Sequence, residues 1–210
     1  PSNPELLDAL AQDFVDHKFD VKHIIRVLLN SRVYQLSAEP TASNEHDRQN
    51  FARFYARRLI AEVLHDGVDQ TCGTKTNFGN MASSARAVDL PHEGFGSYFL
   101  DTFDRPRRVT GCECERSASA TLAQVLLMVN SDEIENKVAN DTGKIAVMLK
   151  EKKSVDEIIE ELYLGGYARL PKPEELLATK QYVDADENQR RGLEDVLWTI
   201  INSKEFMFNH

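Results

Sequence analysis

The sequence predicts an all-α fold: one multi-helix globular domain with a long irregular segment at its centre. Apolar residues recur at three- and four-residue steps on both sides of the middle of the chain, which indicates amphipathic helices. Helix-start signals stand directly before most of these stripes. Only two or three short stretches have the character of a strand. We therefore expect an N-terminal helical part over residues 1–70, an irregular segment over 71–117 and a C-terminal helical part over 118–210.

The N-terminal part begins with a clear helix-start signal. Asn3 and Pro4 combine a capping residue with proline at the first helical position. The apolar stripe that follows consists of Leu6, Leu7, Leu10 and Phe14. Asp20 is expected to cap a second helix over residues 21–29, and a long third helix is predicted over residues 44–69.

The periodicity fails between Gly73 and Gly96, where glycine, serine, asparagine and proline are scattered. A loop of this length is uncommon in a compact domain and is usually functional or mobile. A short helix is predicted over residues 97–103. Beyond residue 117 further helices are expected over residues 118–130, 131–140, 143–152, from Ser154 onward, 173–185 and 188–202. Gly165 and Gly166 are expected to end or kink the helix that Ser154 caps.

Composition narrows the class of protein. An apolar content of 41% with 28% charged residues is typical of a globular chain. The formal net charge of −9 repels phosphate backbones, which argues against nucleic-acid binding. No apolar run approaches the length of a membrane span. Because the chain opens on a helix-start signal without methionine, we expect it to be a fragment of a longer protein.

The segment from Phe103 to Ser117, FDRPRRVTGCECERS, concentrates thiols and charges. Its centre is formed by Cys112, Glu113, Cys114, Glu115 and Arg116. One residue between the two thiols is short for a tetrahedral zinc site, and a disulfide between them would be strained. A link from Cys72 to either thiol is open by sequence separation. Inert buried thiols, a disulfide, and metal or redox chemistry all remain open, with inert thiols favoured.

The charges of this segment have two interpretations as well. Glu113 and Glu115 can pair with arginines, either with Arg105, Arg107 or Arg108 nearby or with those of the predicted long helix. Such clusters are more often structural than catalytic, so a structural role is favoured. In the predicted long helix, Arg57, Arg58, Glu62 and Asp66 are further candidates. A solvated salt-bridge ladder along that helix is favoured over a face that interlocks with the cysteine segment.

Motifs of the common cofactor classes are absent from the sequence. The six histidines form no pair at ligand spacing, and there is no P-loop, dinucleotide fingerprint or nucleophile elbow. We expect no cofactor and no metal in this segment.

Several segments in combination resemble one family. They are NPELLDALAQDFV, RRLIAEVLHDGV, FDRPRRVTGCECERSASATLAQVLLMVNS, ELYLGGYARLPKPEE and INSKEFMFNH. The chain resembles the planctomycete-type C-terminal domain of unknown function that is found downstream of cytochrome c modules. The resemblance implies export to a periplasmic or cell-surface location, and partners among the upstream domains of the same protein, including a haem-bearing module. It implies no catalytic residue, and in that setting a disulfide from Cys72 gains weight.

Two functions are weighed on these grounds. The favoured one is a helical interaction or scaffold module in an exported multidomain protein associated with a cytochrome c module. The alternative is a catalytic or metal-binding domain that acts on polysaccharide-derived substrates, with residues 73–96 as a substrate loop. Whether the chain is an enzyme stays open between them.

Overall fold

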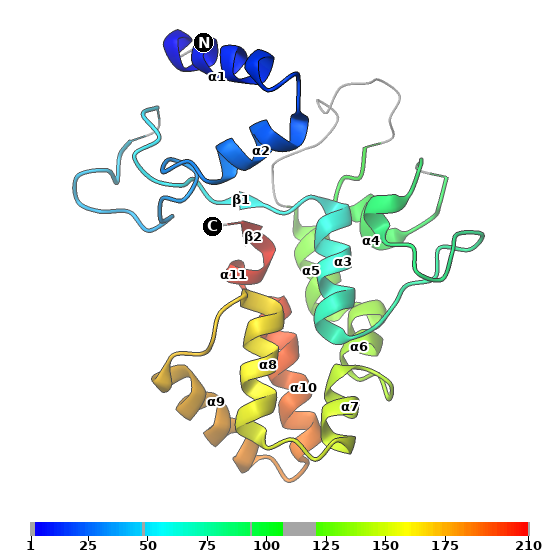
Figure 1. Ribbon diagram of the computed structural model, residues 1–210. Coiled ribbons are helices and arrows are strands. Elements are labelled where there is room, and N and C mark those ends of the chain that lie inside the picture. The colour runs from blue at the N-terminus through cyan, green and yellow to red at the C-terminus, as the bar shows by residue number, and fades with distance from the viewer. Residues whose placement is uncertain (1–2, 48, 93, 107–120, 210) are drawn as a thin grey trace. The chain divides into compact units, whose positions relative to one another are not determined.

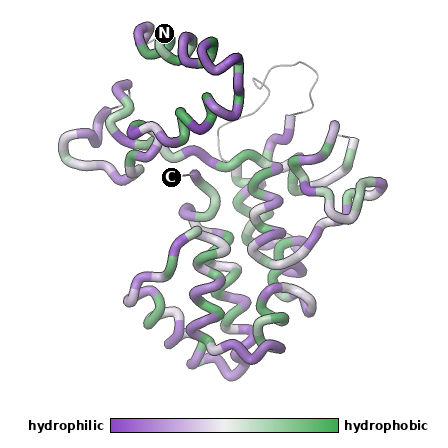
Figure 2. Tube along the Cα trace, viewed as in Figure 1, coloured by the Kyte–Doolittle hydropathy of each residue, from purple (hydrophilic) through white to green (hydrophobic). Residues whose placement is uncertain are grey.

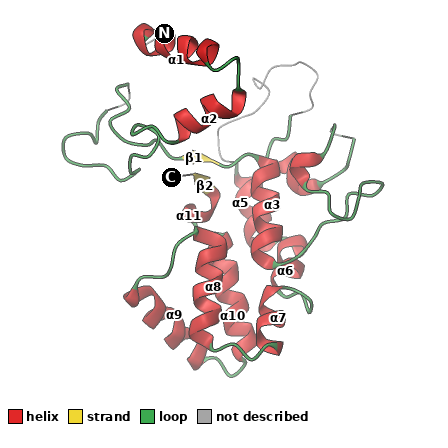
Figure 3. Cartoon of the chain, viewed as in Figure 1, coloured by secondary structure: helices red, strands yellow, loops and turns green. Residues whose placement is uncertain are grey.

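A computed structural model describes residues 3–47, 49–92, 94–106 and 121–209. The chain is mostly helical, with a single short two-stranded sheet among the described residues, so the all-α prediction is confirmed (Figures 1 and 3). It divides into two compact units, one that ends at Arg57 and one over Arg58–Asn209. None of the helices in the described residues is long and apolar enough to cross a lipid bilayer.

The first unit contains two helices, α1 (Pro4–Asp16) and α2 (Val21–Leu29). Both predicted caps are confirmed: the side chain of Asn3 accepts a hydrogen bond from the Leu6 amide, and that of Asp20 accepts from the amides of Lys22 and His23. Neither helix contains a buried residue. Their apolar side chains therefore contribute to the surface of the unit.

The predicted long helix over residues 44–69 is wrong, because the helix begins only at Ala61. The cause is local competition for backbone amides. The carboxylate of Asp47 accepts hydrogen bonds from the amides of Gln49, Asn50 and Ala52, which folds this stretch into a turn in place of a helix. Phe51 accordingly adopts a left-handed backbone, with φ of 53°.

The second unit is built around two groups of helices. The first group comprises α3 (Ala61–Cys72), the 3-10 turn η1 (Ala87–Asp89), α4 (Tyr98–Thr102), α5 (Leu122–Asn130) and α6 (Asp132–Val138). The second comprises α7 (Lys144–Lys150), α8 (Val155–Tyr167), α9 (Pro173–Ala185), α10 (Gln189–Ile201) and α11 (Lys204–Met207). Helix α10 packs against α7, α8 and α9, and α3 packs against η1, α4 and α8 (Figure 1).

The core of the second unit lies where these helices meet. Hydrophobic and hydrophilic residues are interspersed along α8 and α10, as expected for helices with one buried face (Figure 2). The largest fully buried side chains include Leu64, Phe99, Leu100, Ile158, Ile159, Leu162, Leu193, Leu197, Ile200 and Ile201. Strands β1 (Arg57–Arg58) and β2 (Phe208–Asn209) pair, and the Leu59 amide donates to the Met207 carbonyl at 2.9 Å. This pairing brings the end of the chain beside the start of α3.

The predicted helices after residue 117 are largely confirmed, as is the short helix over 97–103. Gly165 and Gly166 do not interrupt α8, which continues to Tyr167 and ends at Ala168 in a left-handed conformation. The stretch between α3 and α4 is irregular as expected, apart from η1.

Candidate functional site

Most of the cysteine segment that the sequence singles out lies outside the described residues. This applies to Arg108, Cys112, Glu113, Cys114, Glu115 and Arg116. The candidates within the described residues are Arg57, Arg58, Glu62, Asp66 and Arg105. The expected ladder on one helix does not form, because Arg57 and Arg58 belong to β1 and precede α3, which carries Glu62 and Asp66.

Arg58 makes a tertiary contact with α5. Its Nη1 atom donates a hydrogen bond to Oε1 of Gln124, and its guanidinium lies 5.8 Å from the centre of the Phe103 ring. Gln124 is only 3% exposed, and its amide nitrogen donates to the Thr102 carbonyl at 3.0 Å. A buried polar group needs hydrogen-bond partners, and Gln124 finds them in Arg58 and Thr102. These bonds hold the Arg58 side chain between α4 and α5.

Glu62 and Asp66 both lie on α3. Glu62 is buried in the first turn of the helix, where a negative charge is favourable for the helix dipole. The Asp66 carboxylate accepts hydrogen bonds from the amides of Ala87 and Val88, at 2.6 and 3.2 Å. Asp66 therefore anchors η1 to α3, and this described contact is structural.

Arg105 is also held by described groups of the fold. Its guanidinium donates to the Asp101 carboxylate at 2.8 Å and to the Phe95 carbonyl at 2.9 Å. The residue is 9% exposed. Arg105 thus links the chain before α4, at Phe95, to Asp101 within α4. Glu113 and Glu115 lie outside the described residues, and so does their predicted pairing with arginines.

A buried polar network, which the sequence interpretation missed, lies between α3 and α6. Lys137 donates to Asp69 at 2.5 Å and to the Thr76 hydroxyl at 2.7 Å. The ring of His65 is 1% exposed, and its Nε2 atom lies 3.6 Å from the carboxylate of Glu133. His65 packs between Phe78 and Phe99, with ring centres 5.5 and 5.2 Å away. The i, i+4 spacing of His65 and Asp69 is the sequence signal that could have indicated it.

The network changes the ionisation of its carboxylates. The contact with His65 lowers the pKa of Glu133 from its ordinary value, and Lys137 adds to this effect against the opposing effect of burial. Burial alone would raise the pKa of Asp69, but the hydrogen bond and the charge of Lys137 outweigh it, so that the pKa of Asp69 is lowered. Both acids therefore stay charged and paired inside the unit.

The irregular stretch after α3 is fastened to this network. The Thr76 amide donates to Asp69 at 2.9 Å, and the Thr74 hydroxyl donates to the same carboxylate. Phe78 and Leu90 are buried in the core. The segment from Gly73 to Gly96 is thus anchored at these points, while most of its described residues are exposed, and its interpretation as a substrate loop stays a prediction.

Cys72, at the end of α3, is the one cysteine among the described residues, and its thiol is free and buried. Burial raises the pKa of Cys72 to about 12. A thiol of this kind is protonated and poorly reactive at neutral pH. Cys112 and Cys114 lie outside the described residues, so whether Cys72 pairs with either thiol stays open as in the sequence analysis.

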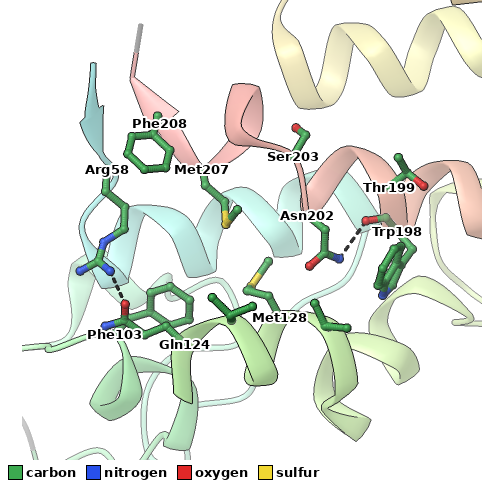
Figure 4. A pocket seen from close by; sticks show the side chains of 12 residues that line it. Arg58, Phe103, Gln124, Met128, Trp198, Thr199, Asn202, Ser203, Met207 and Phe208 are labelled. Carbon is green, nitrogen blue, oxygen red and sulfur yellow. Dashed lines mark hydrogen bonds between the residues drawn. The ribbon is translucent and has the colours of Figure 1, made fainter. Parts of the chain in front are cut away.

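An apolar groove of about 430 Å³ opens on the second unit (Figure 4). Its walls come from α5, from α10 and from the chain that continues through α11 into β2. The lining residues are Arg58, Phe103, Gln124, Val125, Met128, Val129, Trp198, Thr199, Asn202, Ser203, Met207 and Phe208. Met128 and Met207 approach from opposite walls in Figure 4, and Trp198 stands at one end and Arg58 at the other.

A second hollow adjoins the groove at Val129 and Trp198, which line both. Three carboxylates border it, from Glu135, Glu194 and Asp195. The groove therefore passes from an apolar stretch to an acidic end. Sequence reasoning did not predict it, because the walls come from segments about seventy residues apart and their meeting depends on the tertiary fold.

Comparison with known proteins gives a family but no characterised relative. A family model described as PSD1, protein of unknown function (DUF1553), matches residues 1–183. No curated protein and no solved structure matches the chain.

Proposed function

The chain belongs to the PSD1 family of proteins of unknown function (DUF1553), and we propose that it acts there as a helical interaction module. The observation that carries the proposal is the apolar groove between α5 and α10. We infer that this groove receives an amphipathic helix from another domain of the same polypeptide.

The groove is continuous with an exposed apolar stripe on α5. The stripe consists of Leu122, Val125, Leu126 and Val129, at helical spacing and with exposed fractions of 73, 54, 49 and 39%. Single exposed apolar residues are common, but a stripe beside an apolar groove is typical of a protein-binding surface. Grooves of this type bind one face of an amphipathic helix.

The chemistry of the groove defines the segment that fits it. Apolar side chains opposite Met128, Trp198 and Met207 would be removed from water, which favours binding by about 25 cal/mol per Å². A lysine or arginine at one end of the helix would meet the carboxylates of Glu135 and Asp195. The proposed partner is therefore an amphipathic helix with a basic end.

The described charged candidates support an interaction module over a catalyst. Asp66 and Arg105 both bond to main-chain groups, and Lys137 is enclosed by its own acceptors. These contacts hold the unit together. The catalytic or metal-binding alternative that rests on Cys112 to Arg116 stays a prediction, since those residues lie outside the described part of the chain.

The identity and location of the partner rest on the family resemblance alone. The resemblance implies a position downstream of other modules, one of them haem-bearing, in an exported protein. We therefore propose that the helix belongs to one of these upstream domains, and that the protein works in the periplasm or at the cell surface.

Photo-crosslinking in the full-length protein tests the proposal. A photoreactive amino acid replaces Leu126, in the stripe and 49% exposed, or Leu177, a leucine on α9 that is 59% exposed and serves as the control. Crosslinked peptides are identified by mass spectrometry in a mixture of isotopically light and heavy protein. We expect position 126, and not position 177, to link to an upstream domain of the same chain.

Other crosslinking outcomes would contradict the proposed occupant. Links between light and heavy protein would make the surface a contact between two copies. Links from position 126 to α1 or α2 would make it an internal contact of this chain. Equal yields at positions 126 and 177 would show that the stripe has no preferred partner.

The single tryptophan of the chain gives an independent readout, because Trp198 lines the groove. Addition of the separately produced upstream domains should shift its emission in the wild-type domain. The shift should be lost in Leu126→Glu, where a charge on the stripe opposes docking, and kept in Leu177→Glu. An equal shift in both variants would contradict docking at the groove.

A further inference from the structure

Three metal-ligating side chains meet in the first unit, far along the sequence from the cysteine segment. Asp13 and His17 are one helical turn apart at the C-terminal end of α1, and His23 lies in the first turn of α2. One ligand atom from each residue lies within 4.8 Å of the other two. All three belong to the same compact unit.

The carboxylate of Asp13 contacts a ring nitrogen of each of the two stacked imidazoles. Its Oδ2 atom lies 2.9 Å from Nε2 of His23, and its Oδ1 atom lies 3.3 Å from Nδ1 of His17. The rings are nearly parallel, with an interplanar angle of 15° and centres 3.6 Å apart. Two imidazoles and a carboxylate thus converge on a small volume.

The turn between the helices builds this arrangement. Lys18 and Phe19 both adopt left-handed backbones, with φ of 56° and 61°, so the chain reverses within a few residues. Phe19 packs edge-on against Phe14 of α1, with ring centres 5.5 Å apart. Asp20 then caps α2 by accepting from the amide of His23. Helix α2 therefore starts with His23 directed back toward α1.

We propose that Asp13, His17 and His23 form a binding site for one divalent transition-metal ion of the zinc type. Imidazole nitrogen and carboxylate oxygen are ligands that Zn²⁺, Co²⁺ and Ni²⁺ accept. Three protein ligands leave a further coordination position for water or for a group from a partner. The proposal departs from the sequence-based expectation of no metal in this segment.

The position of the site gives the ion a structural consequence. His17 is about half exposed and the other two side chains are partly exposed, so an ion reaches them from solvent. An ion held by all three would join the end of α1 to the start of α2. Because metal binding to the folded form stabilises it, the hairpin of α1 and α2 would become more stable with metal than without.

Zinc titration of the full chain tests the site. The protein is produced without a histidine tag and stripped with a chelator, and Zn²⁺ is titrated into it by calorimetry. We expect one equivalent to bind, and His17→Ala, His23→Ala and Asp13→Asn each to weaken binding at least tenfold. His46→Ala removes an exposed histidine of the same unit and should leave the affinity unchanged.

The absorption spectrum of bound Co²⁺ distinguishes this site from a site with thiolate ligands. Co²⁺ bound by nitrogen and oxygen gives visible d–d bands without the strong near-ultraviolet absorption of a thiolate ligand. We expect d–d bands without thiolate absorption in the wild-type chain, and we expect these bands to be lost in His23→Ala. Thiolate absorption, unchanged zinc affinity in all three variants, or the absence of zinc binding to the wild-type chain would each overturn the proposal. Circular dichroism of every variant establishes that the helices are intact.

Discussion

The ammonium group of Lys137, on α6, lies 2.5 Å from the Asp69 carboxylate, on α3. The side chains of the two residues are only 11 and 14% exposed. Lys137 also donates to Thr76, in the irregular stretch after α3. This one cation therefore fastens two helices and a long connection together, and its removal would leave a buried carboxylate without its counter-charge.

Lys137→Met should destabilise the second unit strongly. Methionine keeps most of the volume but removes the charge, and breaking one side of a buried ion pair costs about 3 kcal/mol. Urea unfolding followed by circular dichroism measures the change. Lys150→Met, at an exposed lysine of α7, is the matched control and should change the free energy of unfolding by less than about 0.5 kcal/mol. Equal effects of the two substitutions would contradict the role of Lys137.

The ionisation of Glu175 should make the free energy of unfolding depend on pH in the acid range. Hydrogen bonds from Arg169, at 2.7 and 2.9 Å, lower the pKa of Glu175 to about 2. A folded-state pKa below the unfolded value of about 4.3 stabilises the fold above that value, and the stabilisation is lost as the pH falls toward about 2. Wild-type protein should be more stable than Glu175→Gln at pH 6, and the difference should shrink steadily between pH 4.5 and 2. A constant difference in urea unfolding across this range would contradict the linkage.

Cys72 should be inert toward alkylation while the protein is folded. Its thiol is buried and its pKa is raised to about 12, so the reactive thiolate is scarce at pH 8. We expect iodoacetamide to leave Cys72 unmodified in native protein and to modify it fully in urea. Peptide mapping by mass spectrometry follows this cysteine separately from Cys112 and Cys114. Rapid native modification at Cys72 would contradict its burial.

The helices were predictable where the signals that form them are local. Ser154 and Glu157 form a capping box that starts α8, and Asn188 caps α10 by accepting from the Arg190 amide. Residues 44–60 do not form the predicted helix, because the Asp47 carboxylate accepts hydrogen bonds from backbone amides that would otherwise bond within a helix. Apolar spacing alone did not show this competition.

The sites were less predictable than the helices because they depend on tertiary contacts. The groove needs α5 beside α10, so that Met128 and Trp198 line one surface. No spacing in the sequence contains that pairing. For the cluster of Asp13, His17 and His23, the sequence alone relates only the first two residues, which are at i, i+4 spacing. Its third member depends on the sharp turn at Lys18 and Phe19.

Arg169 should contribute to the attachment of α11. Its guanidinium binds Glu175 of α9 and also Glu205 of α11, at 2.6 and 3.0 Å. All three side chains are about one-third exposed, so solvent screens the pairs and Arg169→Met should cost about 1–2 kcal/mol. Arg169→Lys keeps the charge but cannot reproduce the planar two-sided contact, and should recover less than half of the loss. Full recovery in chemical unfolding would show that charge alone matters.

Gly166 allows α8 and α10 to approach closely, and a methyl group there should destabilise the fold. A Cβ atom at position 166 would collide with Cγ2 of Ile200, so Gly166→Ala should cost about 1–3 kcal/mol through overpacking. Gly67→Ala is the matched control inside α3, where the nearest atom outside the helix, Cζ of Phe206, lies 3.5 Å from the added Cβ. That substitution should stabilise by up to about 1 kcal/mol because alanine favours helix.

A double-mutant cycle with Ile200→Leu separates this collision from other effects of Gly166→Ala. Leucine has a similar volume but no branch at Cβ, so it removes the atom that the new methyl group meets. The double variant should therefore be more stable than the sum of the two single changes by about 1 kcal/mol or more. If the changes are additive in urea unfolding, the loss in Gly166→Ala does not come from Ile200, and the close approach of the two helices does not require glycine.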